Sequence, residues 1–363
     1  MNLKSNNYND LSLRESEILS SIINLYILKA TPIGSRPLSM YLEGKLKLSP
    51  ATIRNVMSDL EAMNYIAHPH TSAGRIPTDK GYRFYVDNLM KIESVIGYDK
   101  SIETISWQDE IVDNLQNLDS FKNEGDSILK EASKIIGYVS KFLAVVTFPE
   151  LNDLIVQKIE LIQLSSNKLL VVIALDSNIV RTVTLENYFE IDYKHIEKIK
   201  NYINDKVKGR TLLVIKENFS DIVQDLDSDS TPIIRLFIDS IVKLFSKVNE
   251  SEKIITNGTQ NLFEYPEFEN SEKLKSVIEL VENENIIVHI LDNYLENLAE
   301  NTGPKVLIGS EMNNNLLDDY SIVLSPYKFG NANGSIGVIG PKRMNYPKII
   351  SLINAVSNYI TIK

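Results

Sequence analysis

The chain has 363 residues, of which 43% are hydrophobic and 24% charged, a balance typical of a globular protein with two or three domains. It contains no cysteine, which excludes disulfides, a thiol nucleophile and every zinc site that requires sulfur. Residues 1–100 carry 12 Lys and Arg against 10 Asp and Glu, whereas residues 101–363 carry 26 against 38. This asymmetry within a net charge of −10 favours an N-terminal part that meets a polyanion, although many domains that bind no polyanion are equally basic.

The first residues are polar and lack the apolar stretch of a secretory signal. The longest apolar runs are short, such as the seven residues from Leu169 to Leu175, whereas a membrane-spanning helix needs roughly 20 residues. We therefore expect a cytoplasmic protein that has no membrane partner.

Two helices are predicted at the start of the chain. Ser12 and Glu15 have the spacing of a capping box, and apolar residues follow at helical spacing as far as Tyr26. Residues 31–34 contain proline and glycine, which end this helix. Ser35 is then expected to cap the second helix.

A third helix is predicted from Ser49 to Asn64. Ser49 is the expected cap, Pro50 suits the first helical position, and Asn64 accepts the left-handed conformation found just past a helix end. Three helices within about fifty residues, the last two joined by a short connection that contains glycine, match the helix-turn-helix pattern.

A hairpin wing is predicted after the third helix. Two short extended stretches, Tyr65–His68 and Arg75–Thr78, flank a small polar loop at 69–74. A further helix then runs from Thr78 to about Met90. Helix-turn-helix and hairpin together predict a winged helix-turn-helix.

The rest of the chain alternates between helix and strand. The glycines Gly330, Gly334, Gly337 and Gly340 lack the spacing of a phosphate-binding loop and are interpreted as turns at strand ends. In chain order the predicted elements are a helix at Trp107–Gly137, a strand at Phe142–Phe148, three strands within 155–185, helices at 193–207 and 231–249, an acidic aromatic loop at 257–273, strands at Ile286–Leu291, Val306–Gly309, Ser321–Pro326 and Gly334–Gly340, and a helix at Pro347–Ile360.

The third helix has an outward face suited to reading bases. When Ile53 is placed at the centre of the buried face, Ala51, Asn55 and Ser58 point outward, with Thr52 and Arg54 on the flanks. Arg matches the acceptors of guanine, Asn matches adenine, and small residues allow close approach. The predicted DNA-binding residues are Ser49, Ala51, Thr52, Arg54, Asn55 and Ser58 on this helix, Thr71, Ser72 and Arg75 in the wing, and Tyr82 and Arg83 on the next helix.

Other interpretations of these patterns stay open. A three-helix unit can be a pure packing module, and the chain could be a sensor or scaffold that binds protein or a small molecule. An enzyme with an unrecognised site is the third class, although no nucleophile elbow or spaced acid pair is visible. His68 and His70 lack further ligands at metal-binding spacing, so no metal or cofactor is expected.

Several longer blocks of the sequence carry more than a general pattern. They are Thr31-Pro32-Ile33-Gly34-Ser35-Arg36, Ser49 to Met57, His68 to Thr78, Gly81 to Asp87, and Gly334 to Pro341 with Arg343-Met344 and Tyr346-Pro347. These blocks resemble the HrcA family of heat-inducible transcription repressors. The resemblance is ordered along nearly the whole chain, and the block around the wing is long and unusual.

The resemblance implies an α+β multidomain protein. Residues 1–93 would form the winged helix-turn-helix, and residues 94–363 a GAF-like α/β domain that an inserted dimerisation domain interrupts at roughly 150–250. It also implies a dimeric repressor of heat-shock chaperone operons that binds an inverted-repeat operator of the CIRCE type in double-stranded DNA. The chaperonin would modulate its activity. An inverted repeat calls for a two-fold protein with half-sites one helical turn apart, or a multiple of one.

Overall fold

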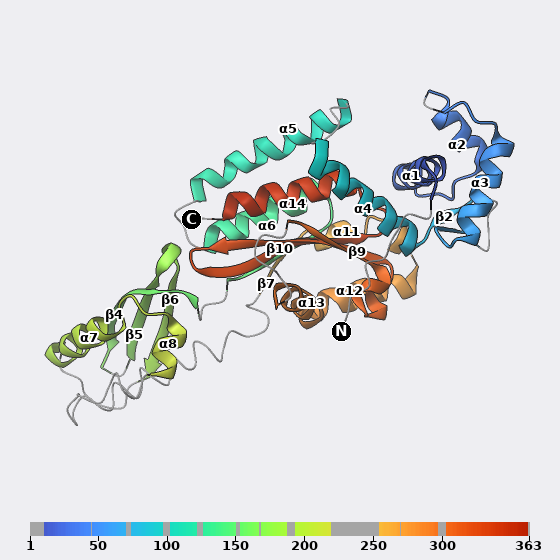
Figure 1. Cartoon of the computed structure of the whole chain (residues 1–363). Helices are drawn as coiled ribbons and strands as arrows, with labels where there is room; N and C mark the ends of the chain where they lie inside the picture. Colours follow the sequence, from blue (N-terminus) through green and yellow to red (C-terminus); the bar gives the residue numbers. More distant parts are fainter. Residues whose placement is uncertain are drawn as a thin grey trace.

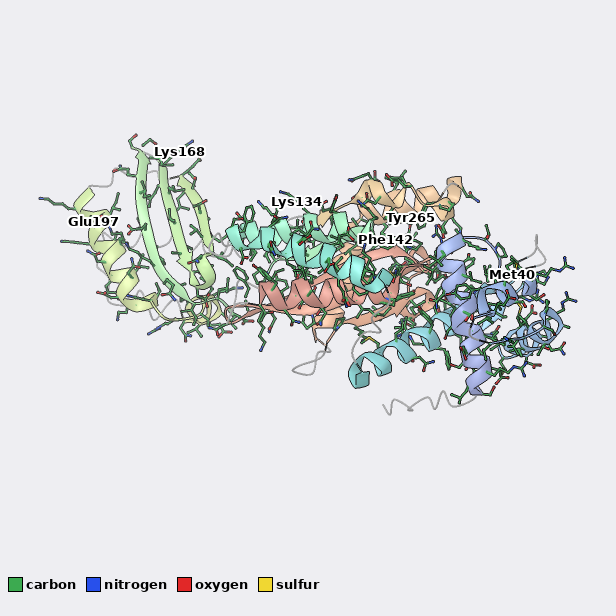
Figure 2. All side chains as sticks on the ribbon, turned by 90° about the horizontal axis from the view of Figure 1, so that it is seen from above. Met40, Lys134, Phe142, Lys168, Glu197 and Tyr265 are labelled. Carbon is green, nitrogen blue, oxygen red and sulfur yellow. The ribbon has the colours of Figure 1, made fainter. Side chains whose placement is uncertain are left out.

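The computed structural model shows three regions, which we call the head (residues 11–96), the body (102–149 with 254–361) and the inserted unit (153–218). The head and the inserted unit lie at opposite ends of the body in both views (Figures 1 and 2). The structure describes residues 11–44, 46–69, 74–96, 102–121, 126–149, 153–166, 168–186, 193–218, 254–268, 270–296 and 303–361.

The head is a helical unit with a small hairpin. Its elements are α1 (Leu13–Lys29), α2 (Ser35–Leu42), α3 (Pro50–Ala62), β1 (Ile66–Ala67), β2 (Ile76–Pro77) and α4 (Asp79–Ile96). Ser12 caps α1, and its backbone N–H donates to the Glu15 carboxylate at 2.7 Å, which confirms the capping box. The predicted cap at Ser35 is wrong, because the residue at the cap position of α2 is Gly34, which has no side chain to accept a hydrogen bond.

The hairpin predicted after the third helix is present. β1 and β2 pair antiparallel, with Ile66 opposite Pro77 and Ala67 opposite Ile76. Backbone hydrogen bonds in both directions between Ile33 and Arg75, each 2.9 Å, tie the hairpin to the connection before α2. These contacts complete a winged-helix arrangement in which the hairpin lies beside the three helices.

The body is built on an antiparallel sheet with helices on both faces. Within the described residues the strand order is β7-β3-β10-β9-β8. Its elements are α5 (Ile102–Gln116), α6 (Asp126–Ser140), β3 (Leu143–Thr147), β7 (Ile254–Asn257), α11 (Thr259–Leu262), α12 (Ser271–Glu282), α13 (Glu284–Glu296), β8 (Lys305–Ile308), β9 (Tyr320–Phe329), β10 (Ala332–Pro341) and α14 (Tyr346–Ile360), with short 3-10 turns at Asn117–Phe121, Pro266–Phe268, Gly309–Met312 and Asn315–Leu317.

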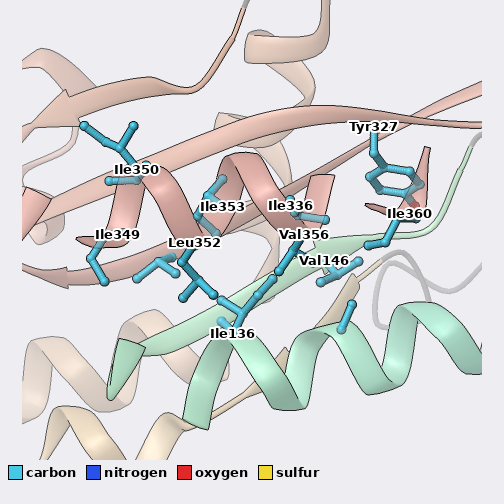
Figure 3. Close-up of a cluster of buried hydrophobic side chains, with 14 of the residues drawn as sticks. Ile136, Val146, Tyr327, Ile336, Ile349, Ile350, Leu352, Ile353, Val356 and Ile360 are labelled. Carbon is cyan, nitrogen blue, oxygen red and sulfur yellow. The ribbon is translucent and has the colours of Figure 1, made fainter. Parts of the chain in front are cut away.

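Alternate residues of the strands face the two helical layers. Ala144 and Val146 of β3 belong to the cluster that includes α6 and α14, whereas Leu143 and Val145 belong to the cluster that includes α12 and α13. In Figure 3, Ile353 and Val356 of α14 lie among side chains of α6 and the sheet. The sheet is therefore buried on both faces.

The glycines of β10 are not the turns that the sequence indicated. Gly334, Gly337 and Gly340 lie within the strand, where a side chain would collide with a neighbour. A Cβ atom at Gly334 would lie 2.4 Å from the Tyr327 ring, and one at Gly340 would lie 2.7 Å from the Phe142 ring. Gly330, with a φ of 62°, does lie in the turn between β9 and β10.

Three other expected elements differ from the structure. The helix predicted at Trp107–Gly137 is divided, because α5 ends at Gln116 and a 3-10 turn follows. The strand predicted at Ile286–Leu291 is wrong, since this short apolar run lies within the helix α13. The expected loop at 257–273 contains α11 and a 3-10 turn. The helix predicted at 231–249 lies outside the described residues.

The inserted unit is a three-stranded meander whose first strand packs against a helix. It consists of β4 (Val156–Ser165), β5 (Lys168–Leu175) and β6 (Val180–Glu186), with α7 (Tyr193–Val207) and α8 (Leu212–Glu217). In the body, β3 pairs with β7 so that Thr147 lies opposite Ile254. The chain therefore leaves the sheet after β3 and returns at β7 next to the strand it left.

Candidate nucleic-acid interface

The buried face of α3 is the one that the spacing predicted. Ile53 and Leu60 are fully buried, and Val56 and Met57 nearly so, in the core that α3 shares with α1 and α2. This packing fixes the rotation of α3 about its axis, because turning the helix would expose these apolar side chains. The opposite face must then point to solvent.

The residues predicted to read bases occupy that opposite face. Ala51, Arg54, Asn55 and Ser58 are exposed, and Thr52 is half-buried. In the part of the chain that the structure describes, no hydrogen bond or ion pair is recorded for the side chains of Arg54 and Asn55. Binding of a ligand to these groups would therefore break no contact inside the protein.

The beginning of α3 is closed by its own side chains. The Ser49 hydroxyl accepts a hydrogen bond from the Thr52 backbone N–H at 3.1 Å and lies 2.9 Å from the Thr52 hydroxyl. Ser49 is therefore the cap of the helix, as predicted. Both hydroxyls remain near the surface at the positive end of the helix dipole, where an anion is favoured.

Arg75 connects the wing to α3. Its Nε and one terminal nitrogen each lie 2.8 Å from the same oxygen of Glu61, and its side chain is only 19% exposed. Glu61 is thereby neutralised on the helix that would approach DNA. Thr71 and Ser72, the other predicted wing residues, lie outside the described residues.

Tyr82 does not lie where a phosphate could reach it. Its side chain is 2% exposed, and its ring lies 6.1 Å from the ring of Tyr346 in the body. Burial raises the pKa of the Tyr82 hydroxyl well above its ordinary value. The expectation that Tyr82 contacts DNA is corrected, because this residue packs between the head and the body.

Arg83 is also engaged with the body. Its guanidinium forms an ion pair with Glu311 and donates a hydrogen bond of 2.7 Å to the Val306 carbonyl, with Asp87 at 3.4 Å. These partners take four of the five N–H donors of the guanidinium, and the side chain is 19% exposed, so in this arrangement Arg83 is bound to the body and largely withdrawn from solvent. The expected phosphate contact of Arg83 is corrected in the same way.

The sequence carried no local signal for this second use of α4. Arg83 and Glu311 are 228 positions apart, so neither periodicity nor spacing could pair them. Lys80, which follows the wing, donates a hydrogen bond of 2.9 Å to the Met63 carbonyl at the end of α3 and lies over the Tyr65 ring. The polar residues after the wing thus support the head and its attachment.

No other chemistry competes with this surface in the described residues. There, no group of three or more His, Asp or Glu side chains is arranged to hold a metal ion. Every helix in the described ranges is too short or too polar to cross a lipid bilayer. A compact winged helix that presents an exposed arginine and amide on its third helix defines the DNA-binding class of transcription regulators.

Comparison with known proteins identifies the family. Residues 10–90 match the winged helix-turn-helix DNA-binding domain of the HrcA transcription repressor, and residues 126–350 match the HrcA C-terminal domain. The heat-inducible transcription repressor HrcA of Chlorobium phaeobacteroides strain BS1 is 33% identical over 357 residues, which cover 98% of both chains. That of Chlorobaculum tepidum is 34% identical over 352 residues, or 96% of both chains.

The chain belongs to the HrcA family of heat-inducible transcription repressors. Its relatives are DNA-binding regulators, so it is a repressor and not an enzyme. A crystal structure of a hypothetical protein determined at 2.2 Å resolution has a similar fold, with a TM-score of 0.62 at 23% identity, covering 97% of this chain and 99% of that chain.

Proposed function

We propose that this repressor binds an inverted-repeat operator of the CIRCE type as a dimer and reads each half-site with the outward face of α3. The observation that carries the proposal is the exposed pair of Arg54 and Asn55, which have no partner recorded inside the described part of the protein. A guanidinium and an amide offer the two donor and acceptor patterns that discriminate guanine and adenine in the major groove.

The remaining residues of the face would support this reading. Ala51 and Ser58 are small, so the helix axis can approach the groove closely, and they flank Asn55 along the exposed face. Ser49 and Thr52 place hydroxyls at the positive end of the helix, where they would contact a phosphate.

We propose that Thr71 and Ser72 at the wing tip, together with Arg75, hold the phosphate backbone and set the register of the head. Hydroxyl and guanidinium groups make such contacts without reading sequence. The ion pair of Arg75 with Glu61 leaves only part of its guanidinium for this purpose, so we assign Arg75 the smaller share.

The dimer contact is proposed to lie on the inserted unit. One face of its sheet packs against α7, and the other exposes apolar side chains, including Ile162 (47% exposed), Leu164 (54%) and Val180 (52%). Ile162 lies opposite Leu170 across the strand pair, so apolar groups continue over this face. A two-fold contact between two such faces would bury them, and the continuity of this apolar surface supports the proposal.

The proposal extends to regulation and targets. On the family relationship alone, we propose that the regulated genes are chaperone operons and that the chaperonin keeps the repressor active. Footprinting of the DNA upstream of the organism's own chaperone operons, with and without chaperonin, tests all of these statements. We expect protection of an inverted repeat and stronger protection with chaperonin.

Salt dependence provides an independent test. A dimer that neutralises about six phosphates should lose roughly a thousandfold in affinity between 50 and 200 mM salt. A chain without affinity for duplex DNA at either salt concentration, or one that sediments as a monomer at micromolar concentration with operator present, would contradict the proposal.

A further inference from the structure

A polar network joins the first two turns of α4 to the body. The Asp79 carboxylate accepts hydrogen bonds from the Lys342 ammonium at 2.6 Å and from the backbone N–H and hydroxyl of Ser310 at 3.1 and 3.0 Å. One turn later, Arg83 pairs with Glu311. We call Asp79, Arg83, Glu311 and Lys342 the head–body network.

Each ion pair of the network is anchored by the fold of the body. Arg83 also donates to the carbonyl of Val306 on β8, the edge strand of the sheet. The Glu311 carboxylate accepts a further hydrogen bond of 2.9 Å from the backbone N–H of Ile308. This bond holds the carboxylate in the position at which it pairs with Arg83. Planar guanidinium and carboxylate groups in a bidentate pair define an orientation as well as a distance.

Close packing surrounds the network. Gly309 has a φ of 49°, and a Cβ atom there would lie 2.4 Å from a carboxylate oxygen of Asp79, so only glycine permits this approach. Tyr346 of the body lies against the rings of both Tyr82 and Tyr85, at 6.1 and 6.4 Å between centroids. Asp79, Tyr82 and Arg83 share one face of α4, because they are three and four positions apart.

Partial burial makes the network sensitive to the loss of either partner. The side chains of Arg83 and Glu311 are 19% and 32% exposed, and those of Lys342 and Asp79 are 27% and 28% exposed. A charge that is left in such a place without its partner is costly, so the head is held in one orientation on the body.

We propose that the head–body network sets the distance and rotation between the two α3 helices of the dimer and thereby selects the operator by the spacing of its half-sites. This inference rests on the dimer proposed above. The head and the inserted unit lie at opposite ends of the body (Figures 1 and 2), so the orientation of each head determines where its α3 lies relative to the two-fold axis.

The required precision follows from the geometry of DNA. A spacer changed by one base pair moves the second half-site by about 3.4 Å along the helix and by about a tenth of a turn around it. A head attached by a flexible connection alone would follow such a change, whereas a head held by charged pairs and packed rings would not. The four residues are therefore positioning residues that do not touch DNA.

The first experiment measures binding of the full-length chain to operators whose spacers differ by one or two base pairs. We expect the wild type to bind one spacer at least about tenfold more tightly than its neighbours. Arg83→Met, which keeps the apolar stem, and Glu311→Gln should reduce that preference to about threefold or less, with unchanged affinity for a single half-site. Lys134→Met, which removes the exposed pair of Lys134 with Glu131 on α6, is the matched control.

The second experiment measures the head-to-head distance directly. Because the chain has no cysteine, a single Cys carries the only spin label of each protomer. Met40 on α2 is 76% exposed, so a label on Met40→Cys reports on the heads, and Tyr138 on α6 is 61% exposed, so a label on Tyr138→Cys reports on the bodies. Dipolar spectroscopy of the dimer should show a narrow distribution at both sites, and Arg83→Met should broaden only the one at Met40.

The outcomes separate the two proposals. A wild type that is monomeric or binds no inverted repeat overturns the proposed function and this inference with it. A wild-type dimer whose spacer preference and head-to-head distribution survive Arg83→Met and Glu311→Gln overturns the inference alone. If Arg83→Met broadens the body distances as well, the variant is misfolded, and Lys342→Gln, which leaves the Arg83 pair intact, replaces it with the same two readouts and the same criterion.

Discussion

The helices α3 and α4 of the head share an amphipathic pattern and differ in use. Both are amphipathic, and both carry an arginine near the start of the helix on a polar side. On α3, Arg54 points to solvent with no partner recorded in the described residues, whereas Arg83 on α4 is enclosed by Glu311 and the Val306 carbonyl. The comparison teaches that an arginine in a DNA-binding domain is available to DNA only if the rest of the chain leaves it unpaired.

The largest expected effect tests the structural role of α4. Tyr82→Ala should destabilise the protein by about 3–5 kcal/mol, because it removes a buried ring packed on Tyr346. Thermal unfolding measures the loss. The half-site preference of the folded fraction should be retained, since Tyr82 reads no bases.

Tyr82→Phe is the matched control for that change. The Tyr82 hydroxyl is buried and has no hydrogen-bond partner among the residues that the structure describes, so its removal should leave stability unchanged or slightly higher. If the Tyr82 hydroxyl contacted a phosphate, Tyr82→Phe would instead lower the affinity for every duplex. That result would show that α4 lies at the DNA interface.

The next effect tests the exposed face of α3. Arg54→Ala or Asn55→Ala should cost about 1–3 kcal/mol on the cognate operator and little on unrelated duplexes, because each removes one bidentate base contact. Titration of labelled cognate and scrambled operators measures the difference. Retained operator preference in Arg54→Ala would place the reading face elsewhere on α3. Lys134→Met again serves as a variant far from DNA.

The smallest effect is a pH dependence of the head–body contact. Partial burial raises the pKa of the Asp79 carboxyl, but hydrogen bonds from Lys342 and Ser310 outweigh it and hold the pKa below its ordinary value. A lowered pKa in the folded protein contributes stability above the unfolded-state pKa near 3.8, and this contribution is lost as the pH falls through the folded-state value.

Asp79→Asn should therefore be less stable than the wild type at neutral pH and should lose less stability between pH 5 and about 3. Chemical denaturation across this range measures how the free energy of unfolding of each protein changes with pH. If it changed equally in the two proteins, the carboxylate of Asp79 would not contribute to the contact between head and body.

Features that depend on neighbouring residues were predictable from the sequence. The capping box at Ser12, the cap at Ser49 and the buried stripe around Ile53 follow from interactions within one or two helical turns, and each is present. The buried stripe of Ile53, Val56, Met57 and Leu60 sets which side of α3 faces outward, so the exposure of Arg54 and Asn55 followed from the same short-range pattern.

Features that depend on distant partners were not predictable. The roles of Tyr82 and Arg83 are decided by Tyr346 and Glu311, which no spacing rule connects to them. The glycines of β10 are likewise required by neighbours elsewhere in the chain, such as the Tyr327 ring beside Gly334. The apolar run at Ile286–Leu291 is compatible with both strand and helix. It is helical in the structure, where α13 packs on the sheet.

The order of the strands has a consequence for biosynthesis. The interior strand β3 is buried along its whole length and pairs with the central strand β10, and the Thr147 hydroxyl donates a hydrogen bond to the carbonyl of Ser335, 188 positions later. At about 5–20 residues per second, a ribosome needs roughly 10–40 s to deliver that partner. During this interval β3 has no partner on the side that β10 will occupy, so its backbone groups there stay unpaired. The elements of the head all precede residue 97, so the head can fold well before the sheet that orients it is complete.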